Sequence, residues 1–286
     1  MKILVIIPAY NEASFIEECL ISLQNQNFPA NEIIVVDDSS TDNTFALVSE
    51  FCSKHSSFAC VQKENTDQKG HQPGAKIVEA FLFGLSHAKS DYDVVCKFDA
   101  DLIFPSDYLA KMKTAFETNP KIGMFGGFCE VKKEGVWQVE NLTGKEHLRG
   151  ALKAYRKECY QSIGGLRPYM GWDTLDELLA YFYGWELEID ETLLVKHLKP
   201  TGTNYRKELP KLYGVSCFQI GYDFGLCFFA SLKMGLKRKS IGFVFKACYY
   251  YIQAKNEGKE VLVNKEEQNF IRSYRWKKIK EKLGLS

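Results

Sequence analysis

Short apolar runs alternate with segments of helical periodicity through the first half of this chain, and this alternation constrains the fold more than any other feature. Strand-like runs cover residues 3–7, 33–36, 58–62 and 122–131, and another ends at Asp99. Between most of these runs, apolar residues recur every three or four positions, as they do on one face of a helix. A chain in which strands alternate with helices is typical of an α/β fold with a mixed, mostly parallel sheet that is flanked by helices.

Bulk composition excludes several classes of protein. The chain has 286 residues, of which 45% are hydrophobic and 26% are charged, so it is neither disordered nor collagen-like and is long enough to bury a full core. Its nine cysteines include no Cys-x-x-Cys pair, which argues against a disulfide framework and against a zinc site. We therefore expect reduced thiols and a cytoplasmic protein.

The second half is less regular than the first, and it becomes aromatic and basic near the C-terminus. The patterns predict helices over 155–163 and 176–183, a strand over 193–197, and helices over 212–236, 240–255 and 266–283. We expect a nucleotide-binding domain over residues 1–204 and a helical, basic and aromatic C-terminal extension over residues 205–286.

Charge is distributed unevenly along the chain. The net charge is +1, yet residues 233–286 contain 14 Lys and Arg against 5 Asp and Glu. Residues 214–232 have nearly the length of a membrane span, but Gln219 and Asp223 in the middle argue against one. Two interpretations remain for the basic tail: peripheral contact with an anionic membrane, on its cytoplasmic face, or the solvated faces of ordinary helices. A nucleic-acid partner is not expected.

Three of the predicted strands end in polar residues. They are followed by Tyr10-Asn-Glu12, by Asp37-Asp-Ser39 and by Asp99-Ala-Asp101. Because the carboxyl ends of parallel strands meet at one edge of a sheet, these groups should lie together, where ligands of open α/β sheets bind. Two carboxylates one residue apart favour a divalent cation, and Mg²⁺ in turn favours a substrate with a diphosphate.

These segments carry a resemblance. Ile-Pro-Ala-Tyr-Asn-Glu, Ile-Val-Val-Asp-Asp-Ser-Ser-Thr-Asp and Phe-Asp-Ala-Asp, in this order and spacing, resemble the inverting glycosyltransferases of family 2. The resemblance covers residues 3 to about 202 and implies the GT-A fold. It also implies transfer of a sugar, with inversion and with Mg²⁺ or Mn²⁺, from a nucleotide-diphosphate donor to a hydroxyl acceptor.

The resemblance assigns expected roles residue by residue. Tyr10 would lie against the base, Asp38 or its neighbour Asp37 would accept a hydrogen bond from the base imide, which favours UDP, and Asp99 would face the ribose or the sugar. The whole expected set for the nucleotide sugar is Pro8, Ala9, Tyr10, Glu12, Asp37, Asp38, Lys76, Asp99 and Ala100. The metal would be held by Asp101 and His197, with Asp99 beside them.

The general base is less sharply indicated. Inversion needs a carboxylate that takes the proton of the acceptor hydroxyl, and the family supplies it near the start of a helix. Three residues are candidates, ranked Asp173, then Asp176, then Glu177. Trp172 and Tyr169 are candidates to contact the sugar or the acceptor, although aromatic side chains more often pack in a core.

Two other functions remain open. A sugar nucleotidyltransferase also uses an α/β sheet and acidic metal ligands, but it usually has a glycine-rich loop after the first strand, where this chain has Pro-Ala-Tyr-Asn-Glu. A catalytically inactive partner subunit that binds the sugar nucleotide is the second alternative. For an active enzyme, the basic and aromatic tail favours a glycan or lipid-linked acceptor, in polysaccharide, glycan or glycolipid synthesis.

Overall fold

The structure is a computed structural model, and it describes residues 1–64, 74–140, 147–199 and 208–284. The chain forms two compact units, one of residues 1–168 with 183–201 and one of residues 169–182 with 202–286. Packing therefore groups the segment 169–182 with the C-terminal helices. The functional boundary expected at residue 204 stays a prediction.

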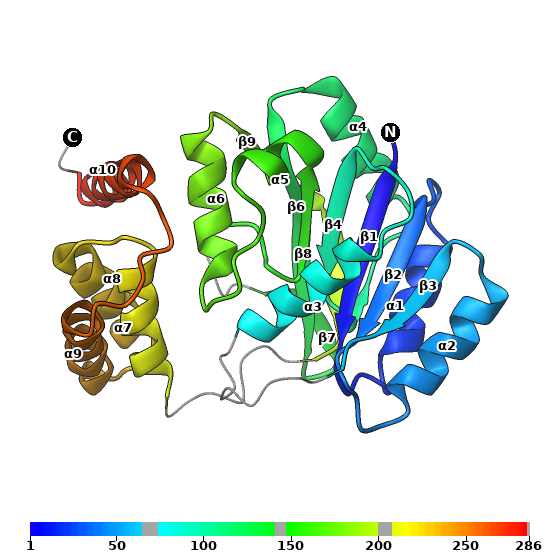
Figure 1. The fold of residues 1–286 in the computed structure, drawn as a ribbon, viewed down its shortest axis with the longest axis horizontal. Coiled ribbons are helices and arrows are strands. Elements are labelled where there is room, and N and C mark those ends of the chain that lie inside the picture. Colours follow the sequence, from blue (N-terminus) through cyan, green and yellow to red (C-terminus); the bar gives the residue numbers. More distant parts are fainter. Residues whose placement is uncertain (65–73, 141–146, 200–207, 285–286) are drawn as a thin grey trace. The chain divides into compact units, whose positions relative to one another are not determined.

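The first unit is built on one mixed sheet (Figure 1). Its strands are β1 Ile3–Ala9, β2 Glu32–Asp37, β3 Phe58–Gln62, β4 Val94–Phe98, β5 Leu102–Ile103, β6 Ile122–Lys133, β7 Val136–Val139, β8 Leu152–Arg156 and β9 Glu186–His197. They lie in the order β3-β2-β1-β4-β8-β6-β9-β5, with β7 paired to β6. The pairs β2–β3, β1–β2, β1–β4 and β6–β9 are parallel, and β8 is antiparallel to both β4 and β6.

Helices cover both faces of this sheet, and strand alternation explains how. Ile3, Val5 and Ile7 of β1 belong to a core that also contains residues of α1 Ile16–Gln24 and α4 Tyr108–Thr118. The next residue along, Ile6, lies on the opposite face beneath α3 Ala75–Ser86, which crosses the sheet in Figure 1. In its described part, this unit also contains the helices α2 Thr44–Lys54 and α5 Lys157–Ser162.

Gly127 in β6 allows β9 to approach closely. A Cβ atom on Gly127 would lie 2.5 Å from the carbonyl oxygen of Leu193, so only a glycine fits there. The register between β6 and β9 shifts at this point, between Gly127 and Phe128. The shift aligns the end of β9 so that His197 pairs with Leu102 of the short strand β5.

Two expected helices are wrong in part. The helix expected over 155–163 is only α5, because Tyr155 is taken into strand β8, where it pairs with Val95 and Met124. The single helix expected over 212–236 is two helices, because Gly221 has a φ of +84° and Asp223 caps a new helix by accepting a hydrogen bond from Leu226 N.

The second unit is entirely helical in its described part. It contains α6 Trp172–Phe182, α7 Leu209–Gln219, α8 Phe224–Lys237, α9 Ile241–Asn256 and α10 Lys265–Lys282. Trp276 Nε1 of α10 donates to Asp223 Oδ2, and Tyr251 of α9 donates to the carbonyl of Tyr222. Within the described ranges, no helix combines the length and the apolar character needed to cross a bilayer.

Two glycines of this helical unit should respond oppositely to the same substitution. A Cβ on Gly214 would lie 2.1 Å from the carbonyl oxygen of Ala247, whereas a Cβ on Gly242 meets open space. We expect Gly214→Ala to lower the free energy of unfolding by about 1–3 kcal/mol through overpacking against backbone. Gly242→Ala should raise it by up to ~1 kcal/mol through helix propensity. Urea unfolding measures both, and a shift in the same direction would contradict this packing.

Candidate functional site

The loops after β1 and β2 are tied together by backbone and side-chain hydrogen bonds. Asp38 N donates to the carbonyl of Ala9 over 2.9 Å, and Asn11 N donates to Ser40 Oγ over 3.0 Å. In return, Thr41 N donates to Asn11 Oδ1 over 2.8 Å. The expected convergence of the first two polar strand ends is therefore confirmed, and it holds the two loops in one fixed arrangement.

The two aspartates that end β2 have different environments. Asp38 Oδ1 is 2.9 Å from Lys63 Nζ, so its charge is compensated. Asp37 is fully buried, and its Oδ2 accepts from Ser40 N and from Gln62 Nε2. Among the residues that the structure describes, Asp37 Oδ1 has no hydrogen-bond partner. A buried acceptor in this state is costly unless a bound donor satisfies it.

Glu12 has the same kind of unsatisfied oxygen. Its Oε1 accepts from Lys199 Nζ over 2.6 Å, while Oε2 is buried with no partner in the described part of the chain. Burial raises the pKa of Glu12, and Lys199 opposes this by favouring the carboxylate. The negative charges of Asp101 and Asp99 raise this pKa further, so Glu12 lies in the field of the third strand end.

At the end of β4, Asp99 is paired with a buried lysine. Lys97 Nζ contacts Asp99 Oδ1 and donates to the carbonyl of Gly150 over 3.0 Å. Lys97 is 1% exposed, whereas the side chain of Asp99 is 25% exposed. Burial raises the pKa of Asp99, the ammonium of Lys97 lowers it, and Asp101 raises it again. The carboxylate therefore faces both a buried cation and solvent.

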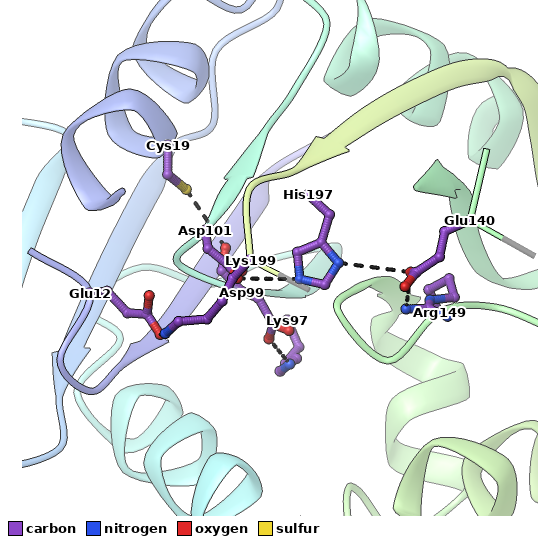
Figure 2. A network of polar contacts seen from close by, with 9 residues as sticks. All are labelled: Glu12, Cys19, Lys97, Asp99, Asp101, Glu140, Arg149, His197 and Lys199. Atoms are coloured by element: carbon purple, nitrogen blue, oxygen red, sulfur yellow. Dashed lines mark hydrogen bonds and ion pairs between the residues drawn. The ribbon is translucent and has the colours of Figure 1, made fainter. Parts of the chain in front are cut away.

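Asp101 lies beside His197 in a line of alternating charges, drawn in Figure 2. His197 Nε2 is 3.3 Å from Asp101 Oδ2, and His197 Nδ1 is 3.9 Å from Glu140 Oε2. Glu140 Oε2 in turn accepts from Arg149 over 2.5 Å. Because Leu198 N also donates to the carbonyl of Asp101, the backbone fixes this pairing as well. The structure thus places His197 next to Asp101, as expected.

The two carboxylates next to His197 control its charge. Burial alone would lower its pKa, but its interactions with Asp101 and Glu140 raise the pKa to about 9. These two carboxylates therefore favour the protonated imidazole, whose charge compensates Asp101. A divalent cation bound here would replace this proton as the compensating charge.

The donor set of this rim suits a hard divalent ion. Asp101 and Asp99 supply carboxylate oxygens and His197 an imidazole nitrogen, which are ligands that Mn²⁺ and Mg²⁺ accept. Among the residues that the structure describes, no three such side chains are already arranged as a metal site. The roles of these residues as metal ligands stay predictions, and their donor atoms fit a hard divalent ion.

The remaining expected nucleotide contacts lie on the same unit. Pro8 and Ala9 end β1 and are buried, Tyr10 is 55% exposed directly after them, and Ala100 is buried between the two aspartates. Lys76 is the second residue of α3 and is half-buried. An exposed aromatic ring at this strand end is suitable for stacking on a base. These contacts stay predictions.

The base candidates and two aromatic candidates lie in the second unit. Asp173 is half-buried in the first turn of α6, while Asp176 and Glu177 are nearly buried. Burial lowers the pKa of Arg275, whereas Tyr222 and then Glu177 raise it. The side chains of Trp172 and Tyr169 are buried, and Tyr169 donates to the carbonyl of Gly171. A role for any of them in catalysis or sugar binding stays a prediction.

Four residues of the charged network were not expected from the sequence: Lys97, Glu140, Arg149 and Lys199. Lys97 had a signal, since it is a lysine within the apolar run Val-Val-Cys-Lys-Phe. Glu140 and Arg149 had none, because only the folded chain brings the segment after β7 to the end of β9.

The family is established by comparison with known proteins. The family described as glycosyl transferase family 2 matches residues 4–172, which is more than half of the chain. The chain belongs to this family, as its motifs indicated. The match includes all three polar strand ends and the start of α6.

Curated relatives match part of this chain. A poly-beta-1,6-N-acetyl-D-glucosamine synthase of Staphylococcus epidermidis is 31% identical over an alignment of 202 residues, which covers 64% of this chain and 45% of that protein. A dolichol-phosphate mannosyltransferase of Pyrococcus furiosus is 32% identical over 138 residues, or 48% of this chain and 36% of that protein. The chain thus spans less than half the length of these two relatives.

Solved structures confirm the expected fold. A mannosyltransferase from Pyrobaculum calidifontis, in complex with GDP-Man and Mn²⁺, has a TM-score of 0.59 at 18% identity, covering 99% of this chain and 86% of that one. S. aureus TarS in complex with UDP-GlcNAc has a TM-score of 0.57 at 19% identity, covering 77% of this chain and 66% of that one. The fold is that of GT-A glycosyltransferases, with C-terminal helices present.

The buried pair of Lys97 and Asp99 should respond asymmetrically to substitution. Asp99→Ala leaves a buried ammonium without its carboxylate, and we expect it to lower the free energy of unfolding by about 3 kcal/mol. Lys97→Met should cost less, because the partly exposed carboxylate of Asp99 can be solvated. Urea unfolding of the two variants and of the double variant tests this. If Lys97→Met were the more destabilising change, the pair would not be organised around the buried lysine.

Proposed function

We propose that this protein transfers a sugar from a nucleoside-diphosphate donor, a UDP-sugar, to a hydroxyl group of its acceptor with inversion at the anomeric carbon. The main support is the convergence of Glu12, Asp37, Asp99 and Asp101 at the carboxyl ends of three parallel strands. Two of these carboxylates keep a buried oxygen that is unsatisfied by the described residues. Membership of glycosyl transferase family 2 agrees with this proposal.

For the donor base, we favour Asp37 over Asp38 as the acceptor of the imide hydrogen. Asp38 is engaged by Lys63, whereas Asp37 Oδ1 is buried and lacks a partner among the described residues. An imide N–H would satisfy it, and uracil carries such a group. The exposed ring of Tyr10 would then cover the base. The ligands bound in the two similar structures, GDP-Man and UDP-GlcNAc, are both nucleotide sugars.

For the metal, we propose Asp101 and His197 as ligands, with Asp99 beside them or directed at the ribose. A bound Mn²⁺ or Mg²⁺ would stabilise the negative charge that develops on the departing nucleoside diphosphate. Two similar structures, the P. calidifontis mannosyltransferase and GalNAc-T7, were solved with Mn²⁺. On this chain, Glu140 and Arg149 would hold the imidazole of His197 in place.

For the general base, we keep the order Asp173, Asp176 and Glu177. A base must reach the acceptor hydroxyl, and Asp173 is the most accessible of the three. The charge of Glu177 interacts with the buried Arg275, and Asp176 Oδ1 accepts a hydrogen bond from Glu177 N over 2.7 Å. These contacts suit structural roles for Asp176 and Glu177. Asp173 would take the proton as the acceptor oxygen attacks from the face opposite the leaving diphosphate.

The acceptor that we propose is a glycan or a lipid-linked glycan, handled in the cytoplasm. The names of the relatives support this class, since one makes poly-beta-1,6-N-acetyl-D-glucosamine and another transfers mannose to dolichol phosphate. Membership of family 2 argues against the nucleotidyltransferase alternative. An inactive partner subunit would bind the donor but would not turn it over, so a turnover assay separates the two remaining functions.

Donor and metal should stabilise the protein together. At a donor concentration 100 times the dissociation constant, we expect about 2.7 kcal/mol of added stability, seen as a higher melting temperature with UDP-sugar and Mn²⁺. Asp101→Ala should abolish the Mn²⁺-dependent part of this shift and the donor turnover. Asp107→Ala is the matched control, because Asp107 is a half-exposed carboxylate paired with Lys111 at the start of α4. An equal Mn²⁺ effect in both variants would contradict the metal assignment.

The base can be separated from donor binding. We expect Asp173→Asn to lower kcat by roughly 10²–10⁴-fold while the donor-induced thermal shift is retained, since only proton transfer is lost. Asp176→Asn and Glu177→Gln should instead lower thermal stability more than turnover. If Asp173→Asn retained turnover and one of the other two variants lost it, the residue changed in that variant would be the base. Binding of the donor by the wild-type chain with no turnover towards any acceptor would support the inactive partner.

A further inference from the structure

Helix α9 of the second unit has two apolar faces, and the described residues cover only one of them. Its inner face consists of Phe243, Val244, Ala247, Tyr251 and Ala254, all nearly or fully buried. This face packs on α7 and α8. A helix that is apolar on both sides normally has a second partner, and the outer face of α9 has none within the described residues.

The outer face is a continuous stripe of large side chains. Ile241, Phe245, Tyr249 and Ile252 are 67%, 72%, 62% and 45% exposed. At 3.6 residues per turn they fall within an arc of roughly 80° along the whole length of the helix. Four large apolar or aromatic side chains aligned in this way form a surface that water solvates poorly. We call these four residues the α9 stripe.

Cations border the stripe on both sides. Lys246 and Lys255 are exposed and lie about 40–60° beyond its two edges on the helix circumference. The end of α8 and the turn into α9 carry three consecutive exposed cations, Lys237, Arg238 and Lys239. Long cationic side chains at the edges of an apolar stripe can extend to the polar side of a lipid interface while their stems cover apolar surface.

A groove next to the stripe adds a place for an anionic headgroup. It lies between the start of α7 and α9 and is lined by Phe245 and Tyr249 together with Lys211 and Lys246. Lys211 Nζ lies 5.9 Å from the ring centre of Tyr250, which also lines the groove. One acidic residue, Glu208, lines it as well. The groove therefore has two ammonium groups among aromatic rings.

We propose that the α9 stripe binds the surface of an anionic lipid bilayer, with α9 lying in the plane of the interface. The helix has 16 residues with the exposed stripe on one side, which suits lying in the interface rather than crossing it. A second copy of this chain is the poorer occupant. In a symmetric pair formed through the stripe, the flanking lysines of both copies would be brought together, and like charges repel.

This inference rests on the helical unit alone and does not depend on the proposed sugar transfer. Flotation of the full chain with vesicles tests it, using equal parts of phosphatidylglycerol and phosphatidylcholine in one arm and phosphatidylcholine alone in the other. We expect the wild-type chain to float with the anionic vesicles. The double variant Phe245→Glu/Ile252→Glu should lower its partition to them by at least about tenfold. The double variant Lys246→Gln/Lys255→Gln should lower the partition to anionic vesicles roughly severalfold. This loss should be smaller at high salt, because salt screens the charges.

Ile21→Glu is the matched control, since Ile21 is a 49% exposed isoleucine on helix α1, and it should bind vesicles like the wild type. Unchanged melting temperatures and donor-induced thermal shifts in all variants would show that fold and donor site are intact. The proposal is overturned if the wild type does not float with anionic vesicles or if Phe245→Glu/Ile252→Glu floats equally well. It is also overturned if sedimentation without lipid shows a dimer that this double variant dissociates, because the stripe would then bind a second copy.

Discussion

The first unit depends on one electrostatic constraint, which is the gathering of carboxylates at one edge of a parallel sheet. Four of the carboxylates form ion pairs: Glu12 with Lys199, Asp38 with Lys63, Asp99 with Lys97 and Asp101 with His197. Without these cations, like charges at such short range would repel one another. The edge is thus held in a charge-balanced state that a bound metal and diphosphate can modify.

The same constraint explains why distant segments of the first unit converge. His197 reaches Asp101 because β9 pairs with β5. On its other side, β9 shifts register against β6 next to Gly127, where no side chain fits. Glu140 and Arg149 then extend the line of alternating charges beyond the imidazole. Strand pairing therefore decides which side chains surround the candidate metal site. The α9 stripe is organised differently, by the periodicity of a single helix.

Much of the fold was predictable because it depends on local pattern. The runs at 3–7, 33–36 and 58–62 are apolar on both strand faces, which only a doubly covered sheet accommodates. Prediction failed where tertiary context outweighed helical periodicity. Tyr155 is a strand residue because β4 and β6 pair on both sides of it, and the break at Gly221 depends on a left-handed conformation that sequence only permits.

By itself, the sequence determined the α/β class, the family, and the three polar strand ends that define the candidate site, because these are carried by local periodicity and by motifs in order. It also contained the four residues of the α9 stripe at helical spacing. Only the tertiary structure decided which charges compensate one another, which oxygens of Asp37 and Glu12 are left unsatisfied by the described residues, and that the outer face of α9 is uncovered. Hydrogen bonding and burial depend on neighbours in space. Glu12 and Lys199, or Asp101 and His197, are far apart along the chain, so the sequence does not show that they are in contact.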